Sequence, residues 1–226
     1  MAEKKQENVN KKKRKKFERW FRFLHFCEKI VRVFYPYKRH YEQFLKGYNG
    51  PLIVVCNHYR LWDVIYPAMA IPSRPVHFMA KQELWDHKVT RWFCNKCQCI
   101  PVSRDGSGTD VKAMMQAIRY LKSGEIITIF PEGKRNTTGA DMLPFKGGAT
   151  ALAIRTKTPI VPVVQIKKAK CFRMSHLIYG TPIEFTEYYD KKVSSEDIQA
   201  CEVKLRDIML KMRADYIAKR AEKKKK

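Results

Sequence analysis

Long apolar runs are missing from this 226-residue sequence. No uninterrupted apolar stretch reaches the roughly 18 residues that a membrane-spanning helix requires. The first residues are basic, but no apolar core and small-residue cleavage site follow them, so we expect no secretion signal. Hydrophobic residues make up 45% of the chain and aromatic residues 12%, which excludes a disordered protein. The length suits one large domain with a core of its own.

Acidic residues are scarce. Asp and Glu total 22 against 46 Lys and Arg, so the formal net charge is +24. Such a charge attracts nucleic acid, an anionic membrane surface or phosphorylated small molecules. The sequence contains no recognised nucleic-acid-binding motif, and this charge alone gives salt-sensitive adhesion to any polyanion. We therefore expect an anionic membrane surface as a partner, and no specific nucleic acid.

The seven cysteines are odd in number and several lie in apolar runs, which favours free thiols in a reducing cytoplasm. Cys94, Cys97 and Cys99 could supply a metal site together with His87, but their spacings differ from those of the usual zinc pairs. Small buried thiols along a strand are the favoured interpretation. We expect no metal.

The N-terminal part divides into two segments. Residues 1–16 are polar and rich in lysine, and we expect them to be disordered. Residues 17–48 form a predicted amphipathic helical arm, in which Pro36 ends the helix and polar residues recur at spacings of four and three. Such a helix either lies in the headgroup layer of a membrane or packs on the domain core, and both alternatives stay open. The predicted membrane-binding residues are Trp20, Phe21, Arg22, Phe23, Phe26 and Lys29.

Residues 49–222 alternate between strand-like and helix-like segments, before a lysine tail at 223–226. This alternation predicts an α/β fold with a largely parallel central sheet flanked by helices. Strands are expected at 51–56, 74–80, 99–103, 125–130 and 159–166, with one or two more within 176–185, and helices at 61–70, 81–93, 109–124, 147–157 and 194–220.

A histidine and an aspartate follow the first strand of this domain, in VVCNHYRLWDV at residues 54–64. In parallel sheets, chemistry gathers where strands end at their carboxyl edge, and His58 lies there. Asp63 can reach His58 only if a turn precedes the next helix, which a strand-to-helix junction supplies. Both residue types favour such turns, so the pair is a candidate base with its orienting acid that needs further support.

Cations follow other strands at the same predicted edge. Arg104 comes after 99–103, Lys134 and Arg135 after 125–130, and Lys146 precedes a helix start. Backbone N–H groups at a helix start attract anions, and arginine donates two parallel hydrogen bonds to a phosphate. Each cation alone is best explained as a solvated surface charge. Four of them beside a His/Asp pair favour a phosphate-binding site.

Four segments in order resemble the glycerolipid acyltransferases, the family of the 1-acylglycerol-3-phosphate (lysophosphatidate) acyltransferases. NHYRLWD (57–63) is similar to their NH-x4-D box and CIPVSR (99–104) to their G-x-IPV-x-R box. FPEGKRNTTG (130–139), with LPFKGGA (143–149), resembles FPEG-[TS]-RS-x-x-G and PFK-x-G, and TPIVPVV (158–164) matches the proline-bearing fourth box. The resemblance covers roughly residues 50–165.

The resemblance implies a role for each matched residue. His58 would be the general base that deprotonates an acceptor hydroxyl, and Asp63 would hold its imidazole. The boxes with Arg104, Glu132, Gly133 and Arg135 would bind the phosphorylated glycerol acceptor, and we add Lys134, Lys146 and Arg60 as candidate contacts.

The chain departs from the family pattern in three places. Tyr59 and Arg60 replace a small polar residue after the histidine, KRN replaces a TRS-like triplet, and Cys97 or Cys99 stands where glycine is common. These departures concern the substrate more than the reaction.

The sequence therefore predicts a peripheral membrane protein at the cytoplasmic face of the cell membrane, forming phosphatidate without a cofactor from a lysophospholipid acceptor and an acyl thioester donor. Two alternatives remain: an acyltransferase for another lysolipid or hydroxylated amphiphile, and a non-catalytic basic protein that binds membrane or nucleic acid. The donor carrier (coenzyme A or acyl carrier protein) and the oligomeric state are left open.

Overall fold

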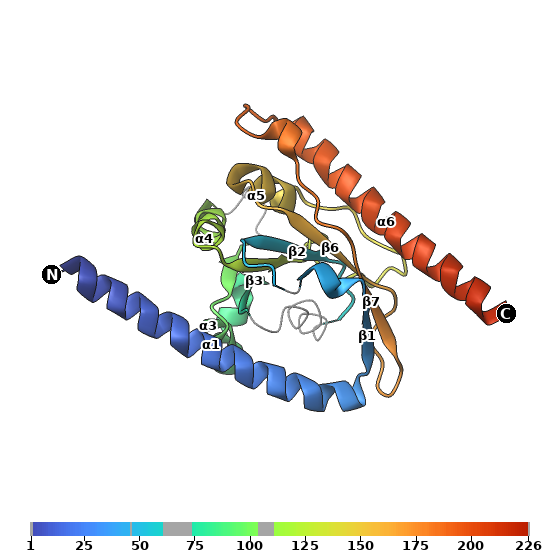
Figure 1. Cartoon of the computed structure of the whole chain (residues 1–226), viewed down its shortest axis with the longest axis horizontal. Coiled ribbons are helices and arrows are strands. Elements are labelled where there is room, and N and C mark those ends of the chain that lie inside the picture. The colour runs from blue at the N-terminus through green and yellow to red at the C-terminus, as the bar shows by residue number, and fades with distance from the viewer. Residues whose placement is uncertain (1, 46, 61–73, 104–110, 226) are drawn as a thin grey trace.

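A seven-stranded sheet lies between two layers of helices in the computed structural model of the chain (Figure 1). The structure describes residues 2–45, 47–60, 74–103 and 111–225. The strands are β1 (Tyr37–His40), β2 (Leu52–Cys56), β3 (Val76–Lys81), β4 (Ile100–Val102), β5 (Ile126–Ile129), β6 (Ile160–Gln165) and β7 (Ser175–Tyr179). The helices are α1 (Ala2–Phe34), α3 (Lys88–Lys96), α4 (Val111–Lys122), α5 (Gly148–Thr156) and α6 (Ser195–Lys225), with short 3-10 turns η1 (Glu42–Leu45), η3 (Gln82–Trp85) and η4 (Thr186–Tyr188).

The strand order is β1-β7-β6-β2-β5-β3-β4, and the sheet is mostly parallel. β2 is central, with parallel neighbours β5 and β6 on its two sides. Among the strand pairs of the described residues, only β6–β7 is antiparallel. The predicted α/β fold with a largely parallel sheet is therefore confirmed, and the carboxyl ends of β2, β5 and β6 share one edge.

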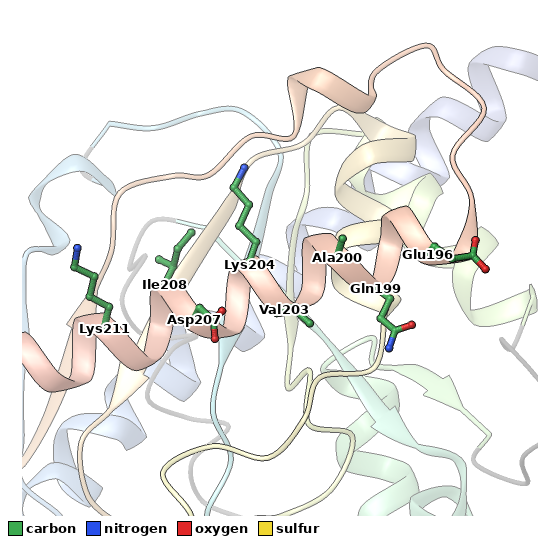
Figure 2. Close-up of a pocket in the computed structure, with 8 residues that line it drawn as sticks. All are labelled: Glu196, Gln199, Ala200, Val203, Lys204, Asp207, Ile208 and Lys211. Carbon is green, nitrogen blue, oxygen red and sulfur yellow. The ribbon is translucent and has the colours of Figure 1, made fainter.

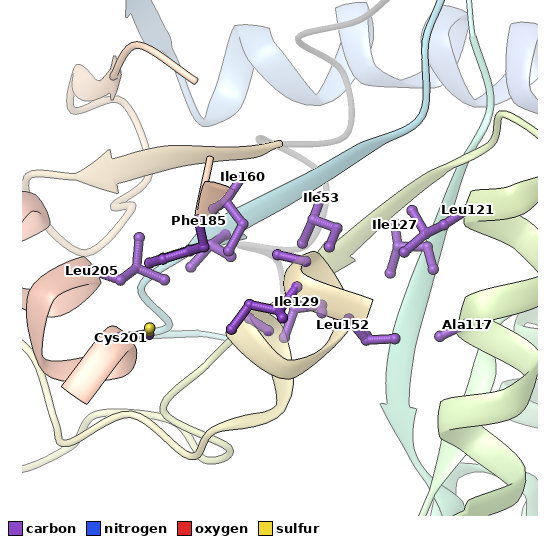
Figure 3. Packing of buried hydrophobic residues seen from close by; sticks show 14 of the residues in the cluster. Ile53, Ala117, Leu121, Ile127, Ile129, Leu152, Ile160, Phe185, Cys201 and Leu205 are labelled. Atoms are coloured by element: carbon purple, nitrogen blue, oxygen red, sulfur yellow. The ribbon is translucent and has the colours of Figure 1, made fainter. Parts of the chain in front are cut away.

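Alternate residues of the central strands enter two separate cores, one on each face of the sheet. Ile53 and Val55 pack with α4, α5 and α6 in the larger core (Figure 3), whereas Leu52 and Val54 pack against α1 on the other face. Such strands are apolar throughout because both of their faces are buried.

The N-terminal segment differs from its predicted form. Residues 2–16, where we expect disorder, continue α1, in agreement with the good helix propensity of their Lys, Glu and Gln residues. Residues 37–40 of the predicted arm form β1, which pairs with β7 at the edge of the sheet. The helix ends at Phe34, just before Pro36 as predicted.

Most predicted elements of the main domain are present. The expected helix at 81–93 is divided into η3 and α3, because His87 has an extended backbone that caps α3. The expected helix at 61–70 lies outside the described residues, as do residues 109 and 110 at the predicted start of α4. Within the described part of the chain, no helix is long and apolar enough to cross a membrane.

Helix α6 contacts both α5 and the segment that precedes α5. Ser194 and Asp197 exchange side-chain-to-backbone hydrogen bonds of 3.1 and 3.0 Å, a capping box at the start of the helix that was predicted from residue 194. The start of α5 has no cap of its own at Gly147, and the Glu202 carboxylate of α6 accepts a hydrogen bond from the Thr150 N–H there at 3.2 Å. Arg206 donates to the carbonyl oxygens of Leu143 and Met142, which fixes the segment before α5.

An open hollow of about 770 Å³ runs along α6 (Figure 2). All eight of its lining residues belong to this one helix, from Glu196 to Lys211. Among the described residues, no second element contributes a side chain, so polar groups do not converge on this hollow as they do in a ligand site.

Candidate active site

His58 stands at the carboxyl end of β2, two residues after the strand ends at Cys56. Its main chain is held by the loop after β5 in two hydrogen bonds. The His58 N–H donates to Glu132 Oε1 at 3.0 Å, and the Asn136 N–H donates to the His58 carbonyl oxygen at 2.7 Å. The imidazole is half-buried and stacks on Phe130, with ring centroids 4.3 Å apart. The loop thus fixes the backbone and one face of the ring.

The preceding residue, Asn57, extends the sheet with its side chain. It is fully buried, its Nδ2 donates to the Gln165 carbonyl oxygen at 3.1 Å, and its Oδ1 accepts from the Gln165 N–H at 2.8 Å. This pair of bonds replaces a ladder pair between β2 and β6 just where β2 stops. Asn57 therefore lets the chain leave the strand in register, with His58 beyond the edge.

Glu132 connects His58 to the far end of the same loop. Its side chain is 1% exposed, and its second oxygen, Oε2, accepts from the Leu143 N–H at 3.0 Å. Burial raises the pKa of this carboxyl group, while the hydrogen bonds from Leu143 and His58 oppose that rise. Both oxygens accept hydrogen bonds from backbone donors, so Glu132 joins His58 to the end of the loop, and its role in binding the acceptor stays a prediction.

The loop closes on itself and brings two predicted site residues together. The Lys146 N–H donates to the Pro131 carbonyl oxygen at 2.9 Å, and the Lys146 side chain lies over Gly133. Gly133 has a positive φ of 66°, and a Cβ there would come within 2.9 Å of Lys146 Cδ. The backbone conformation therefore favours glycine, and any larger residue would also displace the Lys146 side chain.

The other predicted cations lie at the surface. Lys134 and Arg135 are exposed on the loop after β5, next to Gly133, and Arg60 is exposed two residues after His58. Asp63 and Arg104 fall outside the described residues. The structure thus gathers His58, Glu132, Gly133 and Lys146, with Lys134, Arg135 and Arg60 around them.

Sequence reasoning overlooked three residues of this site: Asn57, Phe130 and Asn136. All three stand inside the quoted boxes, so the signal was present, but their contacts join segments far apart in the sequence. Asn136 is the asparagine of KRN. Its side chain bonds within its own turn, to Thr138 and Ala140.

The three clustered cysteines form a small apolar cluster instead of a ligand set. Cys94, Cys97 and Cys99 are buried beside Trp20, whose indole N–H donates to the Cys97 sulfur at 3.4 Å. Throughout the described part of the chain, no group of three or more His, Cys, Asp or Glu side chains is arranged to hold a metal. The seven cysteines are free thiols.

The fold and the site define an α/β domain with a histidine at the carboxyl edge of its central strand and cations on the neighbouring loop. The acyltransferase family model matches residues 25–166, and the chain belongs to this family.

Among its relatives is the 1-acyl-sn-glycerol-3-phosphate acyltransferase of Bacillus subtilis, 36% identical over 149 residues, which are 62% of this chain and 70% of the relative. The enzyme of the same name from Streptococcus pneumoniae is 28% identical over 153 residues, 65% of this chain and 54% of the relative. The human alpha form is 33% identical over 117 residues, 51% of this chain and 41% of the relative. The chain thus spans about half the length of the latter two.

A solved structure with the same fold is that of the 1-acyl-sn-glycerophosphate acyltransferase PlsC from Thermotoga maritima. The TM-score is 0.62 at 22% identity, over 96% of this chain and 83% of that chain. The likeness therefore includes the helices at both ends of the chain as well as the sheet.

Proposed function

We propose that this protein transfers a fatty acyl group from a thioester to the free sn-2 hydroxyl of 1-acylglycerol-3-phosphate, forming phosphatidate. The proposal depends on the position of His58. The loop after β5 holds its backbone at the sheet edge, and the same loop carries the exposed cations Lys134 and Arg135. The names of the relatives from Bacillus subtilis and Streptococcus pneumoniae support the same reaction.

In the proposed mechanism, His58 accepts the proton of the acceptor hydroxyl as its oxygen attacks the thioester carbonyl carbon. The C–O bond forms, the C–S bond breaks, and the proton passes from the imidazolium to the departing thiolate. Asp63 would hold the ring and stabilise its charged form. Because the acceptor attacks the thioester directly, no covalent intermediate on the protein is needed.

The phosphate of the acceptor would meet Lys146, Lys134 and Arg135. All three extend from the loop after β5, and Lys146 is placed over Gly133 by main-chain closure. Charge-assisted hydrogen bonds to phosphate are about twice as strong as neutral ones, so this loop would select acceptors that carry a phosphate. Arg104 is predicted to contribute as well.

We further propose that the exposed face of α1 lies in the headgroup layer, where the lipid substrate resides. Phe17 and Phe21 are 5% and 2% exposed because they pack on the domain. The prediction that Phe21 binds the membrane is therefore wrong. Phe23 and Phe26, by contrast, are 52% and 62% exposed. Arg22 and Lys29 are exposed on the same helix, and Trp20 contacts Trp92 and Phe93 of α3. The rest of this apolar surface consists of Ile30, Val33, Phe34 and Phe172.

Such a surface would attach the enzyme peripherally, at the cytoplasmic face where activated acyl groups are available. A large exposed apolar patch edged by cations is typical of proteins that bind anionic bilayers. The two alternatives for α1 are therefore not exclusive, because one face packs on the core and another is left for lipid.

An acceptor comparison tests the proposed reaction. Thiol release from a long-chain acyl thioester is measured with lysophosphatidate, with monoacylglycerol, which lacks the phosphate, and with lysophosphatidylcholine, whose phosphate is masked. We expect fast release only with lysophosphatidate, and phosphatidate by mass spectrometry. Equal rates with monoacylglycerol would contradict a phosphate-selective site, and no release with any acceptor and either carrier would contradict the reaction.

A further inference from the structure

A second group of cations lies on the other side of β2 from the proposed acceptor loop. It follows β6, in the connection to β7. Because β6 is parallel to β2 and antiparallel to β7, this connection lies at the same sheet edge as His58. Together with α6 it contributes five cations to a pocket of about 470 Å³. These are Lys167, Lys168, Lys170, Arg173 and Arg213.

The charges of this basic pocket are mostly uncompensated. Asp141 is its one acidic lining residue, and it pairs with Arg213 at 2.8 Å between Oδ1 and Nη2. Within the described residues, the four cations of the β6–β7 connection form no ion pair with a carboxylate. Arg213 is only 19% exposed, and its Nε is buried without a hydrogen-bond partner. Like charges brought together without counterions favour an anionic ligand.

The basic pocket adjoins the active site. Tyr59, which follows His58, lines it, and its hydroxyl donates to the Asp141 carbonyl oxygen at 3.1 Å. Asn136 lines it too, and its N–H is bonded to the His58 carbonyl oxygen. A ligand in this pocket would therefore lie near the histidine, between the β6–β7 connection and residues 136–141 of the loop after β5. The pocket's cations are on the β6 side, while the acceptor phosphate is proposed to bind the cations of the loop after β5.

We propose that this basic pocket binds the nucleotide phosphates of a coenzyme A thioester and so selects that donor. The inference rests on the proposed function, which needs two substrates to meet at His58. A phosphorylated acceptor and a nucleotide donor both carry several negative charges, and binding them on opposite sides of β2 keeps like charges apart.

The concave shape favours a nucleotide over an acyl carrier protein. A volume of about 470 Å³ falls in the range of small-molecule pockets. Its cations come from the β6–β7 connection and from α6 and surround one pocket. The nucleotide of coenzyme A carries three phosphate groups close together, and such a cluster of anions needs several cations around one site. A folded protein partner would instead need charges spread over a flat face.

The test neutralises the basic pocket and shortens the donor. The variant Lys167→Gln/Lys168→Gln/Arg173→Gln removes three exposed charges, and its matched control is Lys112→Gln/Arg119→Gln/Lys122→Gln on α4. We expect the pocket variant to raise the KM for acyl-coenzyme A at least about tenfold, the factor expected for lost bonds between charged groups. The KM for lysophosphatidate should stay unchanged, as should kcat/KM with S-acyl-pantetheine, which lacks the nucleotide and all phosphates. The control variant should match the wild type in all three.

Several results would overturn the proposal. An equal loss with S-acyl-pantetheine would show that the substitutions disturb the catalytic loop. A raised KM for lysophosphatidate would assign the pocket to the acceptor. A loss of kcat/KM confined to acyl carrier protein thioesters would assign the pocket to a protein donor. An equal rise of the acyl-coenzyme A KM in the control variant would show that the effect comes from net charge alone.

Calorimetry separates this proposal from the proposed function. Adenosine 3′,5′-bisphosphate is titrated into the protein in the absence of substrates. It should bind the wild type and the α4 control with similar affinity, and the pocket variant at least about tenfold more weakly. This binding requires no turnover, so it would persist if the acyl transfer itself failed. A wild type that does not bind the bisphosphate contradicts the pocket assignment.

Discussion

Glu132 is a buried carboxylate that holds the main chain of the proposed catalytic residue, His58. Its two oxygens bind the backbone of His58 and of Leu143, so it joins the histidine to the closing end of the loop. We predict that Glu132→Ala lowers the free energy of unfolding by about 2 kcal/mol, because two buried N–H groups lose their acceptor. The kcat should fall by about tenfold to a hundredfold, since small displacements of catalytic groups have effects of that size.

Steady-state kinetics and urea denaturation check this prediction. The variant Glu132→Gln keeps one acceptor oxygen, so its kcat should lie between those of the wild type and the alanine variant. If Glu132→Ala instead raised only the acceptor KM, the residue would belong to the acceptor site, as the sequence analysis predicts.

His77 makes stability depend on pH. It is 1% exposed, stacked between Phe17 and Tyr120, and burial lowers its pKa from 6.5 to about 4. The folded state therefore binds fewer protons than the unfolded state between these values. Stability is fully present above pH 6.5 and is lost as the pH falls to about 4, by about 3 kcal/mol in total.

Unfolding free energies measured from pH 7 to pH 4 test this assignment. The variant His77→Gln should flatten the curve in that window, while His87→Gln, at an exposed position, should leave the curve unchanged. Parallel curves for wild type and His77→Gln would contradict the assignment.

At the scale of single residues, the sequence predicted which residues lie together in the candidate site, but not which contacts each of them makes. His58, Gly133 and Lys146 were found because their boxes have a recognisable spacing. The positioning role of Glu132 and the part played by Asn57 depend on backbone donors from other strands, and no local pattern reports those. Asp63 and Arg104 lie outside the described residues, so their roles stay predictions.

Helix α1 has two faces that a matched pair of substitutions distinguishes. Phe17→Ala should lower the free energy of unfolding by about 3 to 5 kcal/mol, the usual cost of removing a buried phenyl ring. Phe26→Ala should change stability by less than about 0.5 kcal/mol, because that ring is 62% exposed. Cosedimentation with anionic vesicles should nevertheless be weaker for Phe26→Ala.

The comparison uses the same substitution on the same helix, so helix propensity cancels. If the double variant Phe23→Ala/Phe26→Ala bound vesicles as well as the wild type, this face of α1 would not be the membrane-binding surface.

Helices α5 and α6 are coupled through Glu202, which caps α5 from a neighbouring element. The carboxylate is 3% exposed and accepts from both the N–H and the hydroxyl of Thr150. We predict that Glu202→Ala lowers the free energy of unfolding by about 1 to 3 kcal/mol, with little change in kcat, because these hydrogen bonds go to Thr150 and not to a residue of the candidate site. Denaturation of Asp207→Ala, at an exposed position on α6, provides the control. Equal stability of both variants would contradict a capping role.

Elements were predictable where their pattern was periodic and buried. The strands β2, β5 and β6 are buried along their whole length and mostly apolar, and the sequence located them to within a residue or two. Strand β1 was missed because Tyr-Lys-Arg-His has no apolar alternation and its partner β7 comes far later in the chain. The packing of α1 could not be decided from its sequence, since an aromatic helix suits both a core and a bilayer.

On the scale of the whole molecule, part of the positive charge lies at the sheet edge where β2, β5 and β6 end. The loop after β5 and the connection after β6 place cations on both sides of the strand that carries His58. A field of this kind would concentrate the two proposed anionic substrates near His58. The formal charge of +24 alone indicated anionic partners, but their placement required the strand order.

The most direct test of this account measures thiol release from long-chain acyl-coenzyme A, with and without lysophosphatidate, for wild type, His58→Ala and the exposed control His87→Ala. The product lipid is identified by mass spectrometry, and thermal unfolding verifies that each variant is folded. We predict acceptor-dependent release and phosphatidate for wild type and control, and a loss of at least about a hundredfold in His58→Ala, as expected for a general base. A folded His58→Ala variant that retains the wild-type rate would contradict the account.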